Sequence, residues 1–381
     1  MDSMEIFDEL ARWAHDQGVE LNGVAPRSLP GRGIGIVATK PLRANDQILH
    51  VPASALRTLD TVRAEVKESL PKGTKVHAIL AADLALDKPT SQYAPWNAVL
   101  PSRESVSTHL PLAWNDRALH RYLPKPAQAL LNKQQSKFTR DWTAIQQSAL
   151  AASIPKQDDF LYFWLLTNTR TFYHDSAQTA KLAKDDRMVL QPVADLFNHA
   201  DAGCEVAFTA EGFTITADRE YDEGEEVYIC YGKHSNDLLL VEYGFVLADN
   251  RWDEVCLDDA VLPELSRQQK AVLDERGFLG NYVLDQRTVC YRTQVALRLS
   301  CVPVGRWERL VYEGEDGGEV VQQEVDRLLV KILRKYRGKV EDTIQKLEDL
   351  EDCQSWQREV LSLRWQQIRR LVNQTIERLE A

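Results

Sequence analysis

The sequence predicts an α+β fold, because strand patterns and helical patterns occupy separate stretches of its 381 residues. Strand-like runs lie at 33–52 and again at 190–247, and helical patterns broken by prolines fill the stretch between them. Charge-rich helical patterns fill the last third. The sequence shows neither an internal repeat nor a low-complexity tract, so one large domain or two moderate ones are expected.

The first 52 residues predict one helix followed by two strands. Gly18 ends a helix whose apolar residues recur at helical spacing: Ile6, Leu10, Trp13 and Ala14. A glycine-rich turn then leads into an apolar strand at 32–38, and Pro52 ends a second strand at 46–52. We expect these two strands to form a small hairpin.

The rest of the chain predicts helices, then strands, then helices again. Residues 160–166 are apolar on nearly all sides, which predicts a buried helix. Glu211 and Gly212 signal a hairpin turn, and 227–231 alternate as a strand with two distinct faces that ends at Tyr231. Three further helices are predicted, one after the cap Ser235 and two amphipathic ones at 319–337 and 340–380.

Composition excludes several classes of protein. The net charge of −11 argues against a protein that coats nucleic acid, and it is compatible with a basic protein partner. The six cysteines form neither C-x-C nor C-x-x-C pairs, so we expect scattered thiols and no metal site. The N-terminus lacks the pattern of a signal peptide, and 160–166 is too short to span a membrane. We therefore expect a cytoplasmic or nuclear location and no membrane partner.

Three short segments carry residues suited to chemistry. They are the turn 31–35, the run 195–199, and the strand 227–232, which is followed in the sequence by Tyr243 and Phe245. Taken alone, a G-x-G is most often a plain turn, and buried Asn and His are most often core polar groups. A strand tyrosine is likewise most often a packing residue. The run 223–226 is interpreted as a turn with solvated charge and is assigned no chemistry.

In their order and spacing, these segments resemble the SET-domain methyltransferases, and within them the branch of the Rubisco and ribosomal-protein lysine methyltransferases. The resemblance implies a SET domain of small β-sheets with a pseudoknot-like core, placing residues about 22–56 and 190–247 together. It assigns residues 1–250 to this core, with a helical insert at about 57–189. Residues 251–381 more loosely resemble that branch's all-α substrate-binding domain.

The resemblance also implies that the cofactor is S-adenosyl-L-methionine. The backbones of Arg32 and Ile34 would meet its amino-acid end, where Gly33 and Gly35 permit close approach. Arg170 would bind the cofactor carboxylate, which suits the guanidinium fork. The alternative for Arg170 is a surface residue that complements the dipole at a helix C-terminus.

Asp195 begins the Asp-x-x-Asn-His motif of this branch and is placed with the cofactor-binding residues. In the resemblance, Asn198 bonds the methionyl ammonium and His199 the purine edge, largely through the main chain and the Asn amide. Tyr231 corresponds to the catalytic tyrosine, whose hydroxyl steers the amine and accepts C–H···O contacts from the methyl group. Tyr228 lies on the other face of the strand and is the poorer candidate.

The resemblance places Phe172, Tyr243 and Phe245 along the substrate channel. Phe172 favours a lysine acceptor, since the actin-histidine branch has a polar residue there. Phe245 carries no hydroxyl to hold a water, which leaves room for di- or trimethylation. The expected activity is protein-lysine N-methyltransfer to a non-histone protein, such as a ribosomal protein or translation factor, without direct nucleic-acid binding.

Three alternatives stay open. The protein could methylate histidine or a small molecule, or it could be a non-catalytic binding module that keeps the SET fold. The presence of Arg170, Asn198, His199 and Tyr231 together argues against a decayed site. Without the resemblance, the sequence also fits a helical scaffold with a small β domain.

Overall fold

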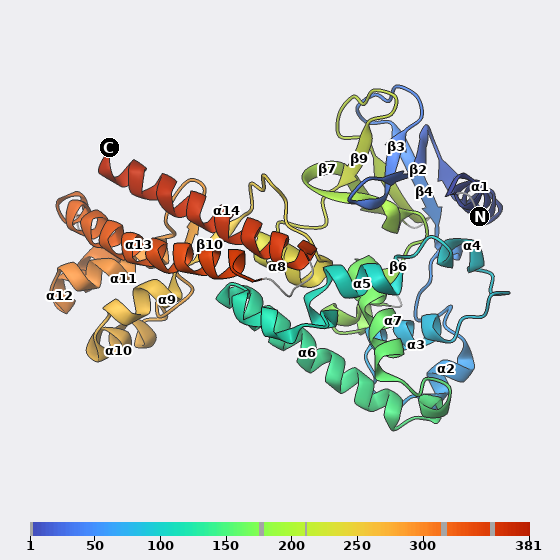
Figure 1. The fold of residues 1–381 in the computed structure, drawn as a ribbon, viewed down its shortest axis with the longest axis horizontal. Helices are drawn as coiled ribbons and strands as arrows, with labels where there is room; N and C mark the ends of the chain where they lie inside the picture. The colour runs from blue at the N-terminus through green and yellow to red at the C-terminus, as the bar shows by residue number, and fades with distance from the viewer. Residues whose placement is uncertain (1–2, 175–178, 210–211, 314–317, 351–354) are drawn as a thin grey trace. The chain divides into compact units, whose positions relative to one another are not determined.

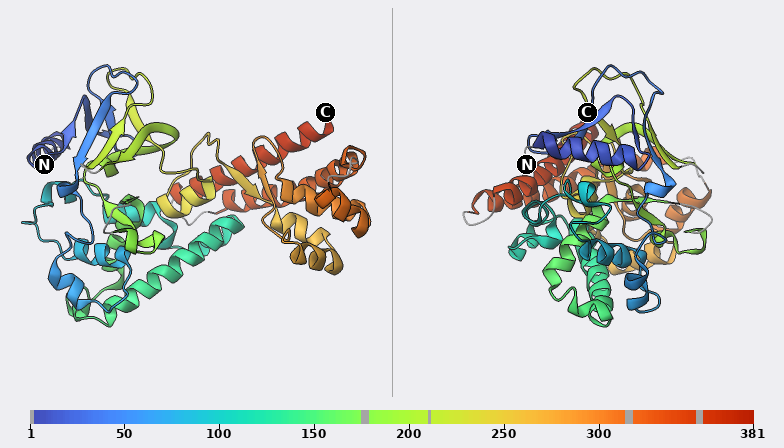
Figure 2. Two further views of the ribbon diagram at one scale, coloured as in Figure 1. Left: turned by 180° about the vertical axis from the view of Figure 1, so that it is seen from behind. Right: turned by 90° about the vertical axis from the view of Figure 1, so that its right-hand side faces the viewer.

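The fold is described from a computed structural model, which describes residues 3–174, 179–209, 212–313, 318–350 and 355–381. The chain forms two compact units. One unit contains Met1–Asn115 and Leu131–Lys233, and the other contains Asp116–Leu130 and His234–Ala381. Each unit is described by itself below (Figures 1 and 2).

A seven-stranded sheet forms the centre of the first unit, in the order β1-β4-β8-β7-β9-β3-β2. All neighbouring strands are antiparallel except β7 and β9, which are parallel. The early and late strand segments therefore lie in one sheet, because β4 pairs with β8 and β3 pairs with β9. The strands are β1 Glu20–Leu21, β2 Val24–Leu29, β3 Gly33–Ala38, β4 Gln47–Pro52, β7 Asn198–Phe208, β8 Gly212–Thr216 and β9 Glu226–Ile229.

The predicted hairpin between 32–38 and 46–52 is wrong. Strand β3 forms its hairpin with the preceding strand β2, and β4 pairs with β1 and β8. Strand β2 contains Pro26, which has no N–H for a ladder, and it lies at the edge of the sheet where a proline is tolerated. Because proline is rare inside strands, the sequence carries no clear strand signal around Pro26, and β3 was therefore predicted to pair with the strand that follows it.

Two further predictions concern the hairpin of β7 with β8 and the end of β9. Strands β7 and β8 pair antiparallel with Phe208 opposite Phe213, as expected, although Glu211 of the predicted turn lies outside the described residues. Strand β9 ends at Ile229, so the prediction that it extends to Tyr231 is wrong. The strand ends at Ile229, so the two-residue alternation of strand side chains does not determine which way Tyr231 points.

Helix α1 (Ser3–Asp16) confirms the predicted N-terminal helix, and its residues Phe7, Leu10 and Ala14 join the core of the sheet. A helix this short is only marginally stable by itself in water, so burial of its apolar stripe supplies most of its stability. The same core contains the apolar faces of the central strands: Ile36, Ile48, Leu49, Val51, Phe213, Ile215, Val227 and Ile229.

Helix α7 (Gln157–Arg170) confirms the predicted buried helix, since Phe160 and Trp164 are fully buried and Phe138 packs against both rings. It leads without a loop into the short strand β5 (Thr171–Tyr173), which pairs with β6 (Met188–Leu190). The other α-helices in this part of the chain are α2 Ala64–Ser69, α3 Val76–Ala85, α4 Ala94–Asn97, α5 Arg103–His109 and α6 Lys125–Gln146.

The second unit is mostly helical, with α13 (Gly318–Glu348) packed along α14 (Ser355–Glu380) (Figure 1). The two long helices were predicted to meet near 338–340. That boundary is wrong, because α13 continues through Gly338 to Glu348 and α14 begins at Ser355. The remaining elements are α8 Asn236–Tyr243, β10 Glu254–Cys256, α9 Asp258–Val261, α10 Arg267–Glu275, β11 Val283–Asp285, α11 Tyr291–Cys301 and α12 Val304–Glu308.

A buried charge cluster holds α14 within this unit. Arg364 is fully buried, and its guanidinium lies 2.7 Å from Asp237 and 2.7 Å from Asp253. A third contact runs from Arg364 to the carbonyl oxygen of Glu254 at 3.0 Å. A buried cation of this kind costs desolvation energy, which two carboxylates and a carbonyl offset here.

Candidate functional site

The glycine turn joins β2 to β3. The backbone N–H of Arg32 donates to the carbonyl oxygen of Leu29 at 3.0 Å, and Gly33 follows with a φ of +74°, which side chains rarely adopt. The side chain of Ile34 packs against the core of the sheet. The side chain of Arg32 stays about half exposed, at 54%.

Glu226, the first residue of β9, lies beneath this turn with a side chain that is only 7% exposed. Its Oε2 lies 2.6 Å from Arg32 Nη1 and accepts a hydrogen bond from the Tyr228 hydroxyl at 2.7 Å. Its Oε1 accepts a hydrogen bond from Asn198 Nδ2 at 2.8 Å. The interpretation of 223–226 as solvated charge is therefore wrong for Glu226. The two-residue alternation of β9, which puts Glu226 on the face of Tyr228, was the signal that could have found it.

Arg170 lies at the end of α7 and reaches back to Asp195. Its Nη1 donates to Asp195 Oδ2 at 2.9 Å and to the Asp195 carbonyl oxygen at 3.0 Å. The Asp195 side chain is fully buried, and Trp96 Nε1 donates to both of its carboxylate oxygens at 3.1 Å. Burial raises the pKa of Asp195, and the Arg170 charge opposes that rise.

His199 and Tyr231 lie face to face, with ring centroids 5.0 Å apart and planes 28° from parallel. The backbone N–H of Tyr231 donates to His199 Nδ1 at 3.0 Å. The Tyr231 hydroxyl donates to the carbonyl oxygen of Phe197 at 2.6 Å. Two oxygens that can accept weak C–H contacts thus lie side by side, one just before β7 and the other just after β9.

The three predicted channel residues belong to different units. Phe172 of β5 packs edge-on against Phe213, with ring centroids 5.3 Å apart. Tyr243 ends α8 and Phe245 follows the left-handed Gly244, their rings 6.4 Å apart. Burial raises the pKa of Tyr243 to about 12, so this phenol stays neutral. Because Tyr243 and Phe245 lie in the C-terminal unit, their place in a channel stays a prediction.

The first unit therefore brings together most of the predicted site. The parallel register of β7 with β9 sets Asn198 beside Tyr228 and His199 beside Ile229. Glu226 joins Arg32 to Asn198, and Arg170 meets Asp195. Within the described residues, histidine, cysteine and acidic side chains form no group of three or more that could hold a metal ion.

The residues present fit the amino-acid end of S-adenosylmethionine. Arg170 Nε is buried and has no hydrogen-bond partner among the described residues, so this edge of the guanidinium is left for a carboxylate. A Cβ added at Gly35 would lie 2.7 Å from Glu226 Oε1 and 2.8 Å from Asn198 Nδ2. The backbone therefore runs against these polar groups only because position 35 is glycine.

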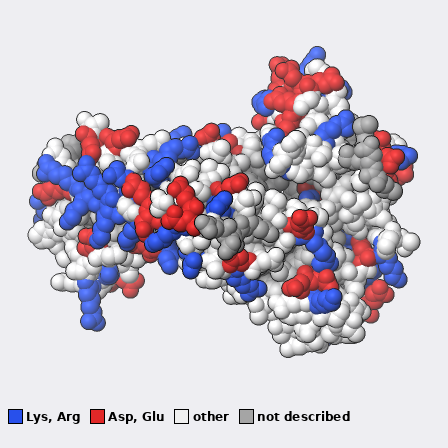
Figure 3. All heavy atoms as spheres, viewed as in Figure 1, with Lys and Arg blue, Asp and Glu red and all other residues white. Residues whose placement is uncertain are grey.

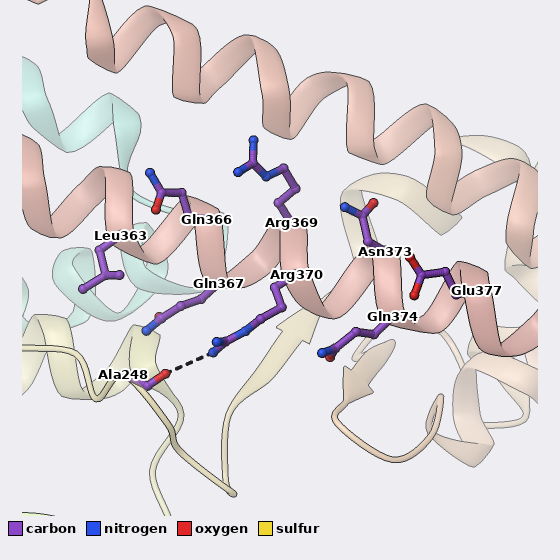
Figure 4. A pocket seen from close by; sticks show the side chains of 9 residues that line it. All are labelled: Ala248, Leu363, Gln366, Gln367, Arg369, Arg370, Asn373, Gln374 and Glu377. Carbon is purple, nitrogen blue, oxygen red and sulfur yellow. Dashed lines mark hydrogen bonds between the residues drawn. The ribbon is translucent and has the colours of Figure 1, made fainter.

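The C-terminal unit carries a groove of its own, with a volume of about 530 Å³. Arg370 spans it and donates to the carbonyl oxygen of Ala248 at 3.0 Å (Figure 4). Its lining comes from Ala248 and one face of α14, and it contains none of the predicted site residues: Ala248, Leu363, Gln366, Gln367, Arg369, Arg370, Asn373, Gln374 and Glu377. The polar groups of the predicted site converge in the first unit instead, around Glu226 and Asp195.

Charge is unevenly spread over the C-terminal unit. Lys and Arg gather on one side of it (Figure 3), where α13 carries six basic residues and no acidic one between 327 and 339. Five of them are exposed: Arg327, Lys331, Arg334, Lys335 and Lys339. The net charge of −11 therefore does not describe every surface of this protein. None of the described helices combines the length and the apolar character needed to cross a membrane.

Two protein-family models match the chain. The SET domain model matches residues 33–232, and the model of the ribosomal lysine N-methyltransferase 2 C-terminal domain matches residues 253–378. Together they cover most of both strand segments and the C-terminal helices.

Similar proteins extend over nearly the whole chain. Ribosomal lysine N-methyltransferase set11 of Schizosaccharomyces pombe is 24% identical over 366 residues, which is 92% of this chain and 93% of that protein. Human SET domain-containing protein 4 is 26% identical and covers 91% of this chain and 84% of its own length. Among solved structures, the SET domain of LSMT bound to lysine and AdoHcy matches with a TM-score of 0.64 at 17% identity, covering 100% of this chain and 92% of that one.

Proposed function

The chain belongs to the SET domain family, and we propose that it is an S-adenosylmethionine-dependent protein-lysine N-methyltransferase that acts on a non-histone protein. The observation that carries this proposal is the pairing of the Tyr231 hydroxyl with the Phe197 carbonyl at 2.6 Å. Phe197 directly precedes Asn198, which opens β7, so this pair supplies two acceptor oxygens next to the start of that strand.

In this proposal, the residues of the chain hold and align the reactants. The cofactor, held by the residues named below, would supply an activated methyl group on its sulfonium sulfur for the lysine nitrogen. The Tyr231 hydroxyl donates to Phe197, so its lone pairs can accept from the amine or from the methyl C–H groups. Lysine must arrive without its proton, and a dry site lowers its pKa. Alignment then supplies much of the acceleration.

The cofactor contacts belong to the same proposal. The turn backbone at Arg32 and Ile34 and the amide of Asn198 would take the methionyl ammonium, and Arg170 its carboxylate. His199 would take the purine edge. Asp195, whose carboxylate is bound by Trp96 and Arg170, would act on the cofactor through Arg170.

We also propose the acceptor class and the division of labour within the chain. The relative set11 is named as a ribosomal lysine N-methyltransferase, and the aromatic Phe172 supports a lysine acceptor, so a basic ribosomal protein is the favoured substrate. Residues 1–250, including the insert at 57–189, would carry the transfer, and 251–381 would bind the substrate protein. Action in the cytoplasm or nucleus, without direct nucleic-acid or membrane binding, completes the proposal.

A label-transfer experiment tests this function. Purified protein and tritiated S-adenosylmethionine are added to a cell lysate, and any labelled band is identified by mass spectrometry. Tyr231→Phe serves as the test variant and Tyr291→Phe, at an exposed tyrosine of α11, as the matched control. The proposal expects a band with methylated lysine that fades only with Tyr231→Phe. Label on histidine or on a small molecule, or no label despite cofactor binding, would contradict it.

A further inference from the structure

Glu226 joins three polar groups that come from separate segments of the first unit. Arg32 belongs to the turn between β2 and β3, Asn198 opens β7, and Tyr228 lies on β9 itself. All three place a donor within 2.8 Å of the Glu226 carboxylate. Burying this carboxylate, whose side chain is only 7% exposed, costs desolvation energy, which the three donors offset.

The contact with Asn198 determines how that amide is oriented. A carboxylate only accepts hydrogen bonds, whereas an amide side chain has a donating –NH₂ and an accepting oxygen. Glu226 Oε1 therefore holds the –NH₂ group of Asn198, at 2.8 Å, and turns the amide oxygen the other way. An ammonium has three donors and no acceptor, so it needs that oxygen and not the –NH₂ group.

We propose that Glu226 is a positioning residue that fixes the Asn198 amide with its oxygen toward the ammonium of the cofactor's methionyl end, and so selects for a cationic ligand there. This inference rests on the proposed function and assigns to it a residue outside the expected binding set. Glu226 itself acts through Asn198 and need not touch the cofactor.

The surroundings of Glu226 keep this arrangement in place. Gly35 lies against the bond between Glu226 and Asn198, and any Cβ at this position would press on both side chains at less than 3 Å. On the other side, Arg32 pairs with Glu226 Oε2 at 2.6 Å and also donates to the Tyr228 hydroxyl at 2.5 Å. Both carboxylate oxygens are thus engaged, which restricts the rotation of the group and of the amide it holds.

Binding of two ligands to the full-length protein tests this inference. S-adenosylhomocysteine carries the ammonium, and 5′-methylthioadenosine lacks the whole amino-acid end, so the pair isolates recognition of that end. Glu226→Gln replaces the carboxylate with an amide that can donate as well as accept, so the Asn198 amide can bond to it in either orientation. We expect it to weaken S-adenosylhomocysteine binding roughly 10-fold in calorimetry, which corresponds to the loss of one hydrogen bond to a charged group. The affinity for 5′-methylthioadenosine should not change. Glu225→Gln, at the partly exposed neighbour that pairs with Arg219, should change neither.

A double-variant cycle separates positioning from a general structural effect. In the Asn198→Ala background, Glu226→Gln should have no further effect on S-adenosylhomocysteine binding, because there is no amide left to orient. Equal weakening of both ligands, an unchanged affinity in Glu226→Gln, or full additivity with Asn198→Ala would overturn the inference. If Glu226→Gln does not fold, Glu226→Asp, which withdraws the same carboxylate by one methylene, is measured against the same two ligands with the same criteria.

Failure of the proposed function would look different. In that case the unmodified protein would bind neither ligand or would transfer no methyl group to protein lysine. If only this inference fails, the unmodified protein still binds both ligands and transfers the methyl group, and only the comparison between the Glu226 variants and their controls departs from expectation.

Discussion

Replacing Arg170 by methionine should separate what this residue does for the fold from what it does for the cofactor. The substitution keeps a long unbranched side chain and removes the charge. Among the described residues, Asp195 would then keep Trp96 alone as a side-chain partner for a carboxylate that is fully buried. Breaking a buried ion pair by removing one partner costs about 3–5 kcal/mol, a large part of the roughly 5–15 kcal/mol that stabilises a domain.

The pH dependence of this loss has a definite sign. Burial already raises the pKa of Asp195 above its unfolded value, and losing the Arg170 charge raises it further. A raised pKa means that the stability is present at low pH and is lost as the pH rises through the folded-state value. The penalty of Arg170→Met, measured by urea denaturation, should therefore be larger at pH 8 than at pH 5.

The double variant Arg170→Met with Asp195→Asn distinguishes the two roles. Asparagine removes the buried charge, so most of the lost free energy of unfolding should return. Binding of S-adenosylhomocysteine should not return, because the guanidinium edge with the unpartnered Nε is gone, and should stay about 10- to 100-fold weaker than in the unmodified protein. If calorimetry shows that affinity recovers together with stability, Arg170 is a structural residue and its assignment to the cofactor carboxylate is refuted.

Four further outcomes are expected. Tyr231→Phe should lower the methyl-transfer rate about 100-fold with S-adenosylhomocysteine affinity within about 2-fold, because the proposed function places this hydroxyl at the reacting atoms; a fall in affinity alone would contradict this. Phe245→Tyr adds a hydroxyl that can hold a water, so mass spectrometry should show a shift toward monomethyl product, and an unchanged product pattern would refute the channel assignment. Arg364→Met leaves two buried aspartates unpaired and should cost about 3–5 kcal/mol in urea denaturation, against a small effect of Arg369→Met. Burial lowers the pKa of His77 to about 4, so the free energy of unfolding should fall by up to about 1.4 kcal/mol per pH unit as the pH drops from 6.5 to 4. If His77→Gln shows the same pH dependence of stability as the unmodified protein, this account is wrong.

Local patterns in the sequence predicted the elements whose stability comes from one buried face. The stripe of α1, the apolar run of α7 and the strands β3 and β4 all appear where hydrophobic periodicity placed them. Their partners were not predictable in the same way. Strand β3 lies between β2 and β9, and its contact with β9 joins Ile36 to Val227 across the insert. Such a pairing depends on the path of the whole chain, which no short window encodes.

The sequence predicted site residues where family motifs mark them and missed a contact that follows from burial. Asn198 and Tyr231 were predicted because they lie in recognisable runs, and their roles in binding and transfer stay predictions. Glu226 was missed because three acidic residues in a four-residue run look like solvated surface, and only the sheet reveals that one of them is enclosed. Glu225, its neighbour just before β9, remains partly exposed and pairs with Arg219. The same two letters therefore have different environments, one before the strand and one within it.

The register of one parallel strand pair accounts for how these pieces become a single site. Setting Asn198 opposite Tyr228 puts the amide within reach of Glu226 and leaves His199 to meet Tyr231 beyond the end of β9. A slip of one residue would exchange the two faces of β9 and turn Glu226 into the core. Burial of Val227 and Ile229 opposes that slip, since both are almost fully enclosed in the sheet core. The apolar residues of β9 thus fix the position of the polar ones, and the chemistry of the turn depends on a strand only four residues long.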